Sequence, residues 1–325
     1  MTHHASPPAL AFEPVFVVGS RRSGTTLLAT LLDRHSQFAV PPETHFFGHF
    51  RQRIGRDPGH AQHRDLVEEF FANQRALDMK LDSEKLLHRF RQYPADLPHL
   101  LRASLEEYAE RLGKARSAEK TPGHLEFVPT ILQWFPRAKI VCIVRDGRAA
   151  VLSTARLGWR DGDIVGLSLM WRQRIRWMLA WERRYPSNFT RVSYEDLLRD
   201  PTGTLGRVDR FVGVQFEASQ LDTSIPTHAI PEWETKWKAK STTEPDLDRL
   251  SAWRHEATDE EMWLMNLLMG RDLRRLNYPD AFPSGRVSMR LLRYVGARFA
   301  QAARAYGPVR KPLHRLSAVA RVLKS

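Results

Sequence analysis

The chain of 325 residues contains one cysteine, Cys142, and no long uninterrupted apolar run. One cysteine cannot form an intrachain disulfide, so a disulfide-stabilised scaffold is excluded and a reducing compartment is favoured. No stretch approaches the ~18 apolar residues that a membrane-spanning helix requires. Residues 1–14 also lack the basic start and apolar centre of a signal peptide. We therefore expect a cytoplasmic protein without a transmembrane helix.

Acidic residues are absent from the segment 286–325, which carries eight Arg and two Lys. Most of the net charge of +13 therefore lies in this tail, and the mildly basic remainder argues against a nucleic-acid-binding protein. Apolar residues of the tail, from Val287 to Tyr306, fall on one helical face. Such a basic amphipathic helix could pack on its own domain, lie peripherally on an anionic membrane, or bind a partner.

A glycine-bounded turn from Gly19 to Gly24 lacks the lysine that follows the second glycine in nucleotide kinases; Thr25 stands there. The apolar run before this turn predicts a buried strand, and the leucine-rich segment after it predicts a helix. Strand, loop and helix together direct backbone N–H groups and a helix N-terminus at one anion. We predict a phosphate loop for a ligand without a γ-phosphate; the alternative is an ordinary basic turn. Its polar residues are Arg21, Arg22, Ser23, Thr25 and Thr26.

Two further strands are predicted, at Lys139–Val144 and Asn188–Ser193. Strands that alternate with helices indicate an α/β fold with a mainly parallel central sheet flanked by helices. We expect one domain, 1–285, with a helical insertion at about 51–114, followed by the basic extension 286–325.

Several helix limits follow from local signals. Thr121-Pro122 predicts a capped helix that runs to about Phe135, and Asp163 predicts the start of a long helix. Thr258 and Glu261 form a capping-box pattern for a later helix. The tryptophans of the long helix, Trp171, Trp177 and Trp181, are interpreted as core residues.

Four segments occur in a fixed order along the chain: Arg22-Ser23-Gly24-Thr25-Thr26-Leu27, Glu43-Thr44-His45-Phe46-Phe47, Glu119-Lys120-Thr121-Pro122 and Ile143-Val144-Arg145-Asp146-Gly147-Arg148 to Ser153. Together they resemble the sulfotransferases that use 3′-phosphoadenosine 5′-phosphosulfate (PAPS). The resemblance is to the branch with tyrosylprotein and heparan sulfate sulfotransferases, and it extends from about Pro14 to Tyr278. It implies a P-loop-containing nucleotide-binding fold, PAPS as co-substrate, 3′-phosphoadenosine 5′-phosphate (PAP) as product, and no metal.

The resemblance implies the roles of the donor site. The loop Arg22–Thr26 would bind the 5′-phosphosulfate, with Arg22 where cytosolic members have lysine. Lys120 would support the transferring or leaving group. Arg145 and Ser153 match the 3′-phosphate site, where an arginine fork and a hydroxyl make a suitable anion clamp; the alternative is a local Arg145–Asp146 ion pair. Tyr194 resembles a residue beside the adenine, and Lys240 with Ser241 loosely resembles a late loop that returns to the nucleotide.

The acceptor hydroxyl has to lose a proton. Glu43 matches the glutamate that acts as general base in both the tyrosylprotein and the heparan sulfate sulfotransferases. His45 is a competing base or a residue that shapes the acceptor site, and His35, His49 and His124 are interpreted as structural. Leu27 replaces an aromatic residue of the cytosolic enzymes, whose late Arg-Lys-Gly motif is also absent. Tyrosylprotein sulfotransferases have arginine in place of His45, which weakens a prediction of peptidyl-tyrosine as acceptor.

We therefore expect a sulfotransferase that acts on a hydroxyl of a glycan, a glycolipid or a small metabolite. The basic tail favours a lipid-linked or membrane-proximal acceptor. Two alternatives remain: a P-loop kinase or NTPase, and a non-catalytic module with this fold that binds anionic lipid or polysaccharide. Magnesium-dependent ATP hydrolysis would identify the first, and liposome binding without turnover the second.

Overall fold

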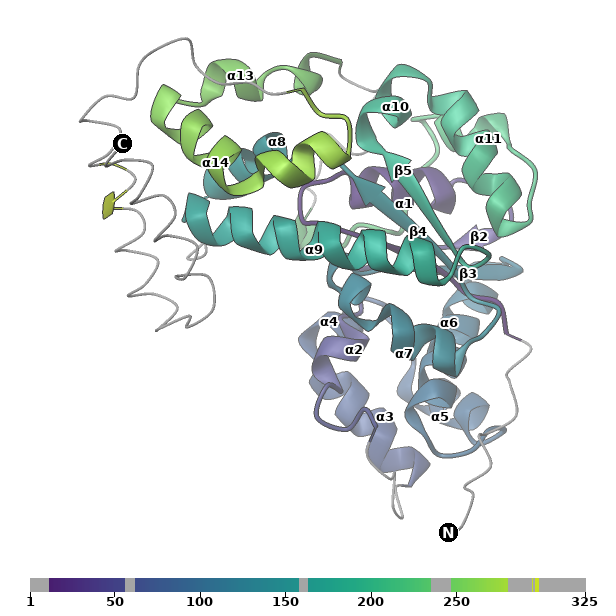
Figure 1. Cartoon of the computed structure of the whole chain (residues 1–325). Helices are drawn as coiled ribbons and strands as arrows, with labels where there is room; N and C mark the ends of the chain where they lie inside the picture. Colours follow the sequence, from purple (N-terminus) through teal and green to yellow (C-terminus); the bar gives the residue numbers. More distant parts are fainter. Residues whose placement is uncertain are drawn as a thin grey trace. The chain divides into compact units, whose positions relative to one another are not determined.

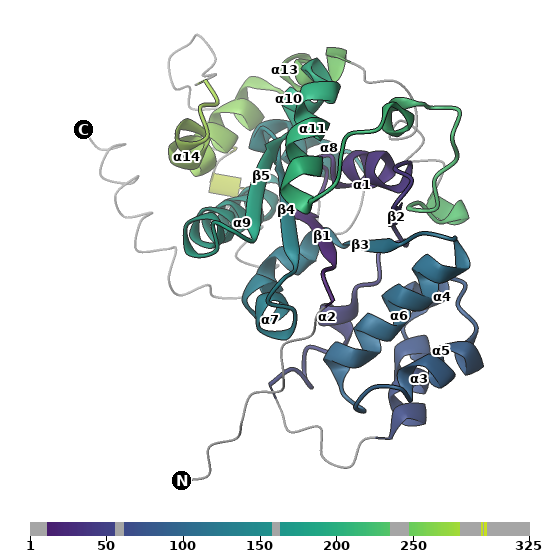
Figure 2. The same cartoon turned by 90° about the vertical axis from the view of Figure 1, so that its right-hand side faces the viewer.

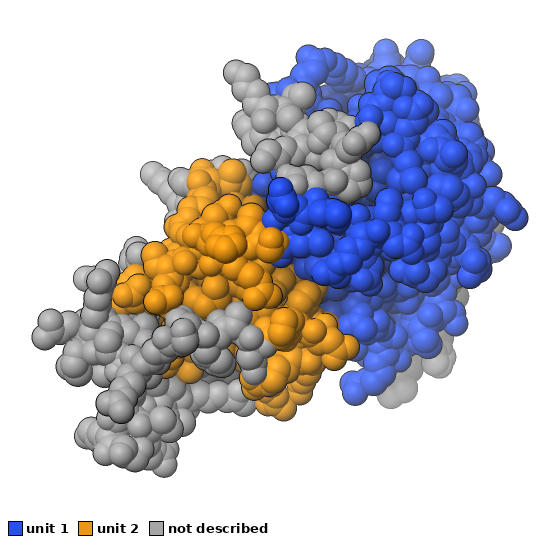
Figure 3. Space-filling model, turned by 90° about the horizontal axis from the view of Figure 1, so that it is seen from above, with its two compact units in different colours: residues 1–145, 174–250 blue, residues 146–173, 251–325 orange. Residues whose placement is uncertain are grey.

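A computed structural model describes residues 12–55, 62–157, 163–234 and 247–279, with 294, 296 and 297 (Figure 1). Internal contacts divide the chain into two compact units (Figure 3). Unit 1 comprises residues 1–145 and 174–250, and unit 2 comprises 146–173 and 251–325. Apart from three residues, the tail 286–325 lies outside the described part of the chain, so its amphipathic helix stays a prediction. The predicted division into 1–285 and 286–325 stays a prediction too.

The centre of unit 1 is a five-stranded sheet with the order β2-β3-β1-β4-β5. Every neighbouring pair in this order is parallel. The predicted α/β fold with a parallel central sheet is therefore confirmed. The strands are β1 Val15–Gly19, β2 Phe38–Ala39, β3 Arg116–Lys120, β4 Lys139–Val144 and β5 Phe189–Ser193.

Both faces of β1 are buried, because helices cover the sheet on either side. Val15 and Val17 belong to a core that includes the leucines of α1 (Thr25–Asp33). Phe16 points to the opposite face, where its ring contacts the rings of Phe47 and Phe135. Figure 2 shows α1 and α7 (Val128–Trp134) on opposite sides of β1. The helices α10 (Tyr194–Arg199) and α11 (Pro201–Val212) complete the α1 face.

The segment 51–114, predicted to be a helical insertion, forms helices where the structure describes it, beside the β2–β3 edge (Figure 2). Its last helix packs against β3, and its buried leucines and Tyr108 explain why a charged segment folds there. The helices of this segment are α3 His63–Ala72, α4 Gln74–Leu77, α5 Ser83–Phe90 and α6 Leu97–Arg111, and the short α2, Phe46–His49, precedes it.

The helix predicted after Thr121 differs from the structure. A 3₁₀ helix, η1 (Pro122–Phe127), comes first, and the α-helix α7 begins only at Val128. The Thr121 hydroxyl does not cap the helix: it donates its hydrogen to the Glu119 carboxylate at 2.6 Å, and its oxygen accepts the backbone N–H of His45 at 3.2 Å. The prediction of a single α-helix capped by Thr121 was therefore wrong, although the segment ends close to Phe135 as expected.

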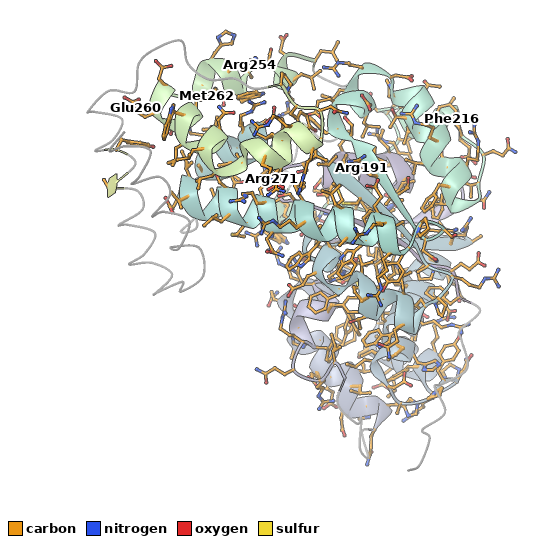
Figure 4. All side chains as sticks on the ribbon, viewed as in Figure 1. Arg191, Phe216, Arg254, Glu260, Met262 and Arg271 are labelled. Carbon is orange, nitrogen blue, oxygen red and sulfur yellow. The ribbon has the colours of Figure 1, made fainter. Side chains whose placement is uncertain are left out.

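Unit 2 contains α8 (Gly147–Ala155), α13 (Trp253–Glu256) and α14 (Asp259–Arg275). The capping box of Thr258 and Glu261 is present as predicted. Figure 4 shows Arg254 on α13 and Glu260, Met262 and Arg271 on α14. Buried Arg148 binds Asp146 and Asn266, which joins the start of α8 to α14.

The long helix α9 (Ile164–Arg184) contributes residues to both units, and Asp163 caps its first turn as predicted. Of its tryptophans, Trp171 is buried, whereas Trp177 and Trp181 are half-buried, so the core assignment is correct in full only for Trp171. Short 3₁₀ helices complete unit 1: η2 Ala218–Leu221, η3 Glu232–Glu234 and η5 Leu247–Leu250.

Candidate active site

The loop between β1 and α1 needs glycine at both of its ends. Gly19 has φ +156°, and a Cβ there would lie 2.5 Å from the backbone oxygen of Ile143. Gly24 has φ +95°, and a Cβ there would lie 2.4 Å from Cδ2 of Tyr194. Real Cβ atoms do not approach other heavy atoms so closely, so the loop passes against β4 and the start of α10 only because these side chains are absent.

Between the glycines, the loop presents groups suited to an anion. Gly24 is the N-cap of α1, and no side chain caps the first turn. The N–H groups of that turn can therefore donate to an anion at the helix N-terminus. Arg22 has the left-handed φ of 61°, a conformation that costs about 1 kcal/mol or more and occurs at functional sites. Ser23 is fully buried, and its Oγ has no hydrogen-bond partner among the described residues. An anionic ligand would supply that partner.

Positive charge gathers at this loop. The Arg145 guanidinium donates to the backbone oxygens of Arg22, at 3.2 Å, and of Arg249, at 3.0 Å. It also lies 4.5 Å from the centre of the Tyr194 ring. Burial, followed by the charges of Arg145 and Arg249, lowers the pKa of Arg22, and Tyr194 acts in the opposite direction. A site that concentrates like charges in this way favours a multiply charged anion.

Arg174 adds charge on the α9 side of the loop. Burial and then the charge of Arg21 lower the pKa of Arg174 to about 10, with Glu126 opposing them. Neither Arg174 nor Arg249 was among the predicted site residues. Sequence alone gave no signal for them, because Arg174 lies in the helix whose tryptophans were interpreted as core and Arg249 lies in the short 3₁₀ helix η5.

Glu43, His45 and Lys120, which were predicted to be catalytic, lie together. Lys120 is fully buried and its Nζ donates to Glu43 Oε1 at 2.7 Å. Nε2 of His45 lies 3.3 Å from Glu43 Oε2. The side chain of Glu43 is 17% exposed, so the carboxylate remains reachable. Lys120 is opposite Val17 in the β1–β3 register, which places this group at the sheet edge where the phosphate loop begins.

A buried glutamate that the sequence analysis left without a role lies behind this group. Glu119 accepts hydrogen bonds from the hydroxyls of Thr44, at 2.8 Å, and Thr121, at 2.6 Å, and from Nδ1 of His124 at 2.8 Å. Burial alone would raise the pKa of Glu119, but the charge of His124 and these hydrogen bonds together lower it. Glu119 is therefore held as a carboxylate, and His124 belongs to its network.

The remaining predicted site residues are placed as follows. Tyr194 contacts the loop, but its role beside adenine stays a prediction. Ser153 lies on α8 in unit 2, so its pairing with Arg145 also stays a prediction. Lys240 and Ser241 lie outside the described residues.

The described residues contain neither a candidate metal site nor a candidate membrane span. No group of three or more His, Cys, Asp or Glu side chains there is arranged to hold a metal ion. Within the same ranges, no helix has the length and apolar character needed to cross a membrane.

Comparison with known proteins identifies the family. The sulfotransferase family model matches residues 14–218. A putative protein-tyrosine sulfotransferase of Caenorhabditis briggsae is 25% identical over 247 residues, covering 67% of this chain and 80% of that protein. Protein-tyrosine sulfotransferase 1 of Danio rerio is 24% identical over 217 residues, covering 64% of this chain and 55% of that protein.

A solved structure supports the fold. The sulfotransferase domain of the Synechococcus PCC 7002 olefin synthase matches with a TM-score of 0.61 at 20% identity, covering 85% of this chain and 98% of that domain. Sulfotransferases have a P-loop-like nucleotide-binding fold, in agreement with the loop and parallel sheet described above. Because the family model covers more than half of the sequence, this chain belongs to the sulfotransferase family of transferases.

Proposed function

We propose that the protein transfers a sulfuryl group from PAPS to a hydroxyl of an acceptor, with Glu43 as general base. The observation that carries this proposal is the reachable Glu43 carboxylate, held by buried Lys120 at the sheet edge where a phosphate loop without a kinase lysine begins. A carboxylate within reach of a bound hydroxyl can accept its proton.

The proposed transfer forms one bond to sulfur, breaks another and moves one proton. The acceptor oxygen forms a bond to sulfur, and the bond from sulfur to the bridging phosphate oxygen breaks. That oxygen keeps the electron pair and leaves as part of PAP, while the acceptor proton goes to Glu43. Because the phosphosulfate anhydride is already activated, the protein has to supply position and charge stabilisation rather than a metal.

The loop and its arginines would bind the donor. The N-terminus of α1, the buried Ser23 hydroxyl and Arg22 would hold the 5′-phosphosulfate and stabilise the charge that develops on the leaving oxygen. Arg145 would bind the 3′-phosphate together with Ser153, as the family resemblance implies. The positive charge shared by Arg22, Arg145 and Arg249 supports this assignment.

Lys120 and His45 would act on the base. The ammonium of Lys120 stabilises the Glu43 carboxylate, and the family resemblance assigns the same lysine to the leaving group. His45 lies within 3.3 Å of the same carboxylate, so it can share the proton or serve as the base itself. The Glu43→Gln variant separates these two possibilities.

For the acceptor, we propose a glycan, a glycolipid or another small hydroxyl-bearing metabolite. A cavity of about 430 Å³ with polar and charged walls, lined by residues 48–53 and Glu69, begins three residues after His45 and would suit a polar molecule. The relatives named protein-tyrosine sulfotransferases make a tyrosine peptide a necessary comparison. Peripheral membrane contact through 286–325 remains part of this proposal.

A turnover assay with radiolabelled PAPS tests the proposal. The full chain is incubated with oligosaccharides, glycolipid vesicles, small alcohols and a tyrosine peptide, and PAP is tested separately for a rise in melting temperature. We expect PAP to raise the melting temperature and label to enter a glycan, a glycolipid or a small alcohol. No rise at millimolar PAP would contradict the nucleotide site, and label in the tyrosine peptide alone would contradict the acceptor class.

A further inference from the structure

The segment that carries the proposed base, Glu43–His45, is joined to the end of β3 and Thr121 by three consecutive contacts. Glu43 binds Lys120 at 2.7 Å. Thr44 binds Glu119 through its hydroxyl at 2.8 Å. The backbone N–H of His45 donates to the Thr121 hydroxyl at 3.2 Å. We call Glu43–His45 the base segment and these contacts its three rungs.

The charge of Glu119 sets the direction of the hydrogen bonds around the base segment. Its Oε1 accepts the hydroxyl hydrogens of Thr44 and Thr121, and a hydroxyl has only one hydrogen to donate. Both hydroxyl oxygens are therefore left as acceptors, for the N–H groups of Phe46, at 3.2 Å, and His45. One buried anion thus orients two hydroxyls, and they in turn hold two consecutive backbone N–H groups.

The base segment needs this support, because its own conformation is strained. His45 has the left-handed φ of 51°, which is unfavourable for a residue other than glycine. Strain of this kind persists only where the surroundings hold the backbone in place. A further hydrogen bond, from the Asn73 side chain to the Thr44 backbone oxygen at 2.8 Å, holds the opposite side of the segment.

We infer that Glu119 is a positioning residue for the proposed reaction: through Thr44 and Thr121 it holds the base segment so that the Glu43 carboxylate stays against Lys120. Glu119 does not touch the reactants. The inference rests on the proposed function for its catalytic consequence, but the structural link between Glu119 and the base segment can be tested without turnover.

Two effects follow when the link is weakened. First, the N–H groups of His45 and Phe46 lose ordered acceptors and exchange with solvent more often. Second, Glu43 spends less time against Lys120, so the carboxylate loses a stabilising charge and the acid limb of the kcat/KM profile moves to higher pH. Among the described residues, the charged or titratable groups that contact Glu43 include Lys120 from β3 and His45 from the start of α2. Glu119 itself faces His124 from η1.

The experiment compares Glu119→Gln and Thr121→Val with the wild-type full chain. The first variant keeps the shape of the side chain but removes its charge, and the second removes one hydroxyl at nearly constant volume. Glu107→Gln is the matched control, because Glu107 loses its charge from a side chain that is only 15% exposed, and it pairs with Arg89 outside the three rungs. Hydrogen exchange of a peptide that spans residues 43–50, PAP affinity, and kcat/KM against pH are measured for each.

For Glu119→Gln we expect amide exchange in residues 43–50 at least tenfold faster than in the wild type, with exchange of the phosphate-loop peptide unchanged. PAP affinity should stay within twofold, kcat should fall about 10- to 100-fold, and the acid limb should move to higher pH. Thr121→Val should show the same changes at smaller size, and Glu107→Gln none of them.

Exchange that stays unchanged, or that rises equally throughout unit 1, would overturn the inference, as would a fall in kcat without a shift of the acid limb. If Glu119→Gln does not fold, Thr121→Val decides between the same outcomes. A wild-type chain that neither binds PAP nor turns over PAPS would contradict the proposed function, and the exchange comparison would still support or overturn the role of Glu119 in holding the base segment.

Discussion

The phosphate loop and the base segment lie at the same edge of the sheet but are held in different ways. The loop is shaped by its backbone: Gly19 and Gly24 leave no room for a side chain against Ile143 and Tyr194. The base segment is shaped by side-chain hydrogen bonds that end on buried Glu119. Damage to the loop should therefore appear as lost nucleotide affinity, and damage to the base segment as lost turnover.

The largest expected effect is a loss of turnover without a loss of nucleotide affinity, on substitution of Glu43 in the base segment. Glu43→Gln keeps the size of the side chain but cannot accept a proton, so kcat should fall about 10³-fold. PAP affinity should stay within twofold, because the loop is unaltered. Calorimetry with PAP and single-turnover assays with PAPS measure the two quantities. Unchanged turnover would exclude Glu43 as the base and leave His45 as the candidate.

For the phosphate loop, the expected effect is a loss of nucleotide affinity. Gly24→Ala places a methyl group 2.4 Å from Tyr194 Cδ2 at a φ of +95°, so the loop must move and the Kd for PAP should rise about 100-fold. Gly206→Ala in α11 is the matched control, since nothing lies within 4 Å of a Cβ there. That control should leave PAP affinity unchanged and stabilise the helix by about 0.5–1 kcal/mol. Equal losses in both variants would show that the effect is not specific to the loop.

A third prediction concerns the role of Arg145 within the donor site. If Arg145 binds the 3′-phosphate, Arg145→Ala should raise the Kd for PAP about 10- to 30-fold, as expected for a charge-assisted hydrogen bond. Affinity for adenosine 5′-monophosphate, which has no 3′-phosphate, should change little. Titrations of both nucleotides give the comparison. Equal losses for the two would instead mean that Arg145 acts by holding the loop through the Arg22 backbone oxygen.

The smallest expected effect lies outside both regions, at Asp209 in α11. Burial raises the pKa of Asp209 from 3.8 to about 6, with the Gln220 hydrogen bond opposing it. The folded state therefore binds this proton more tightly than the unfolded state. Its stabilising contribution is complete below about pH 3.8 and is lost as the pH rises through 6.

Asp209→Asn should accordingly be more stable than the wild type at pH 8, by about 1 kcal/mol, and this advantage should vanish near pH 4. Urea unfolding at several pH values measures the difference. Turnover and PAP affinity should not change in this variant. A stability difference that is independent of pH would contradict the account of Asp209.

The loop could be predicted from sequence because its determinants are local. The apolar run of β1, the two glycines and the leucines of α1 lie within one short stretch, and each has a direct structural meaning. The same holds for β4, β5 and the capping box of α14. A local pattern predicts the folded structure correctly when tertiary contacts favour the same conformation.

The support of the base segment could not be predicted, because it depends on contacts between segments far apart in the chain. Thr44 and Glu119 are 75 residues apart and meet only after β3 pairs with its neighbours in the sheet. The same contacts explain why the Thr121 cap was predicted wrongly: the hydroxyl donates to Glu119 and accepts the N–H of His45, and it makes no bond to the first turn of η1. Arg174 and Arg249 could not be predicted as site residues for a related reason. Nothing in their own segments distinguishes them from the other lysines and arginines among the 50 of the chain.

The central claim is that the loop and Arg145 form a metal-independent site for a nucleotide with phosphates at both the 5′ and the 3′ position. Calorimetric titration of the full chain with PAP and with ADP, both in the presence of a metal chelator, tests it most directly. The two ligands carry the same number of phosphates on adenosine but place them differently. The account predicts micromolar binding of PAP and at least tenfold weaker binding of ADP; equal affinities, or PAP binding that requires a divalent metal, would contradict it.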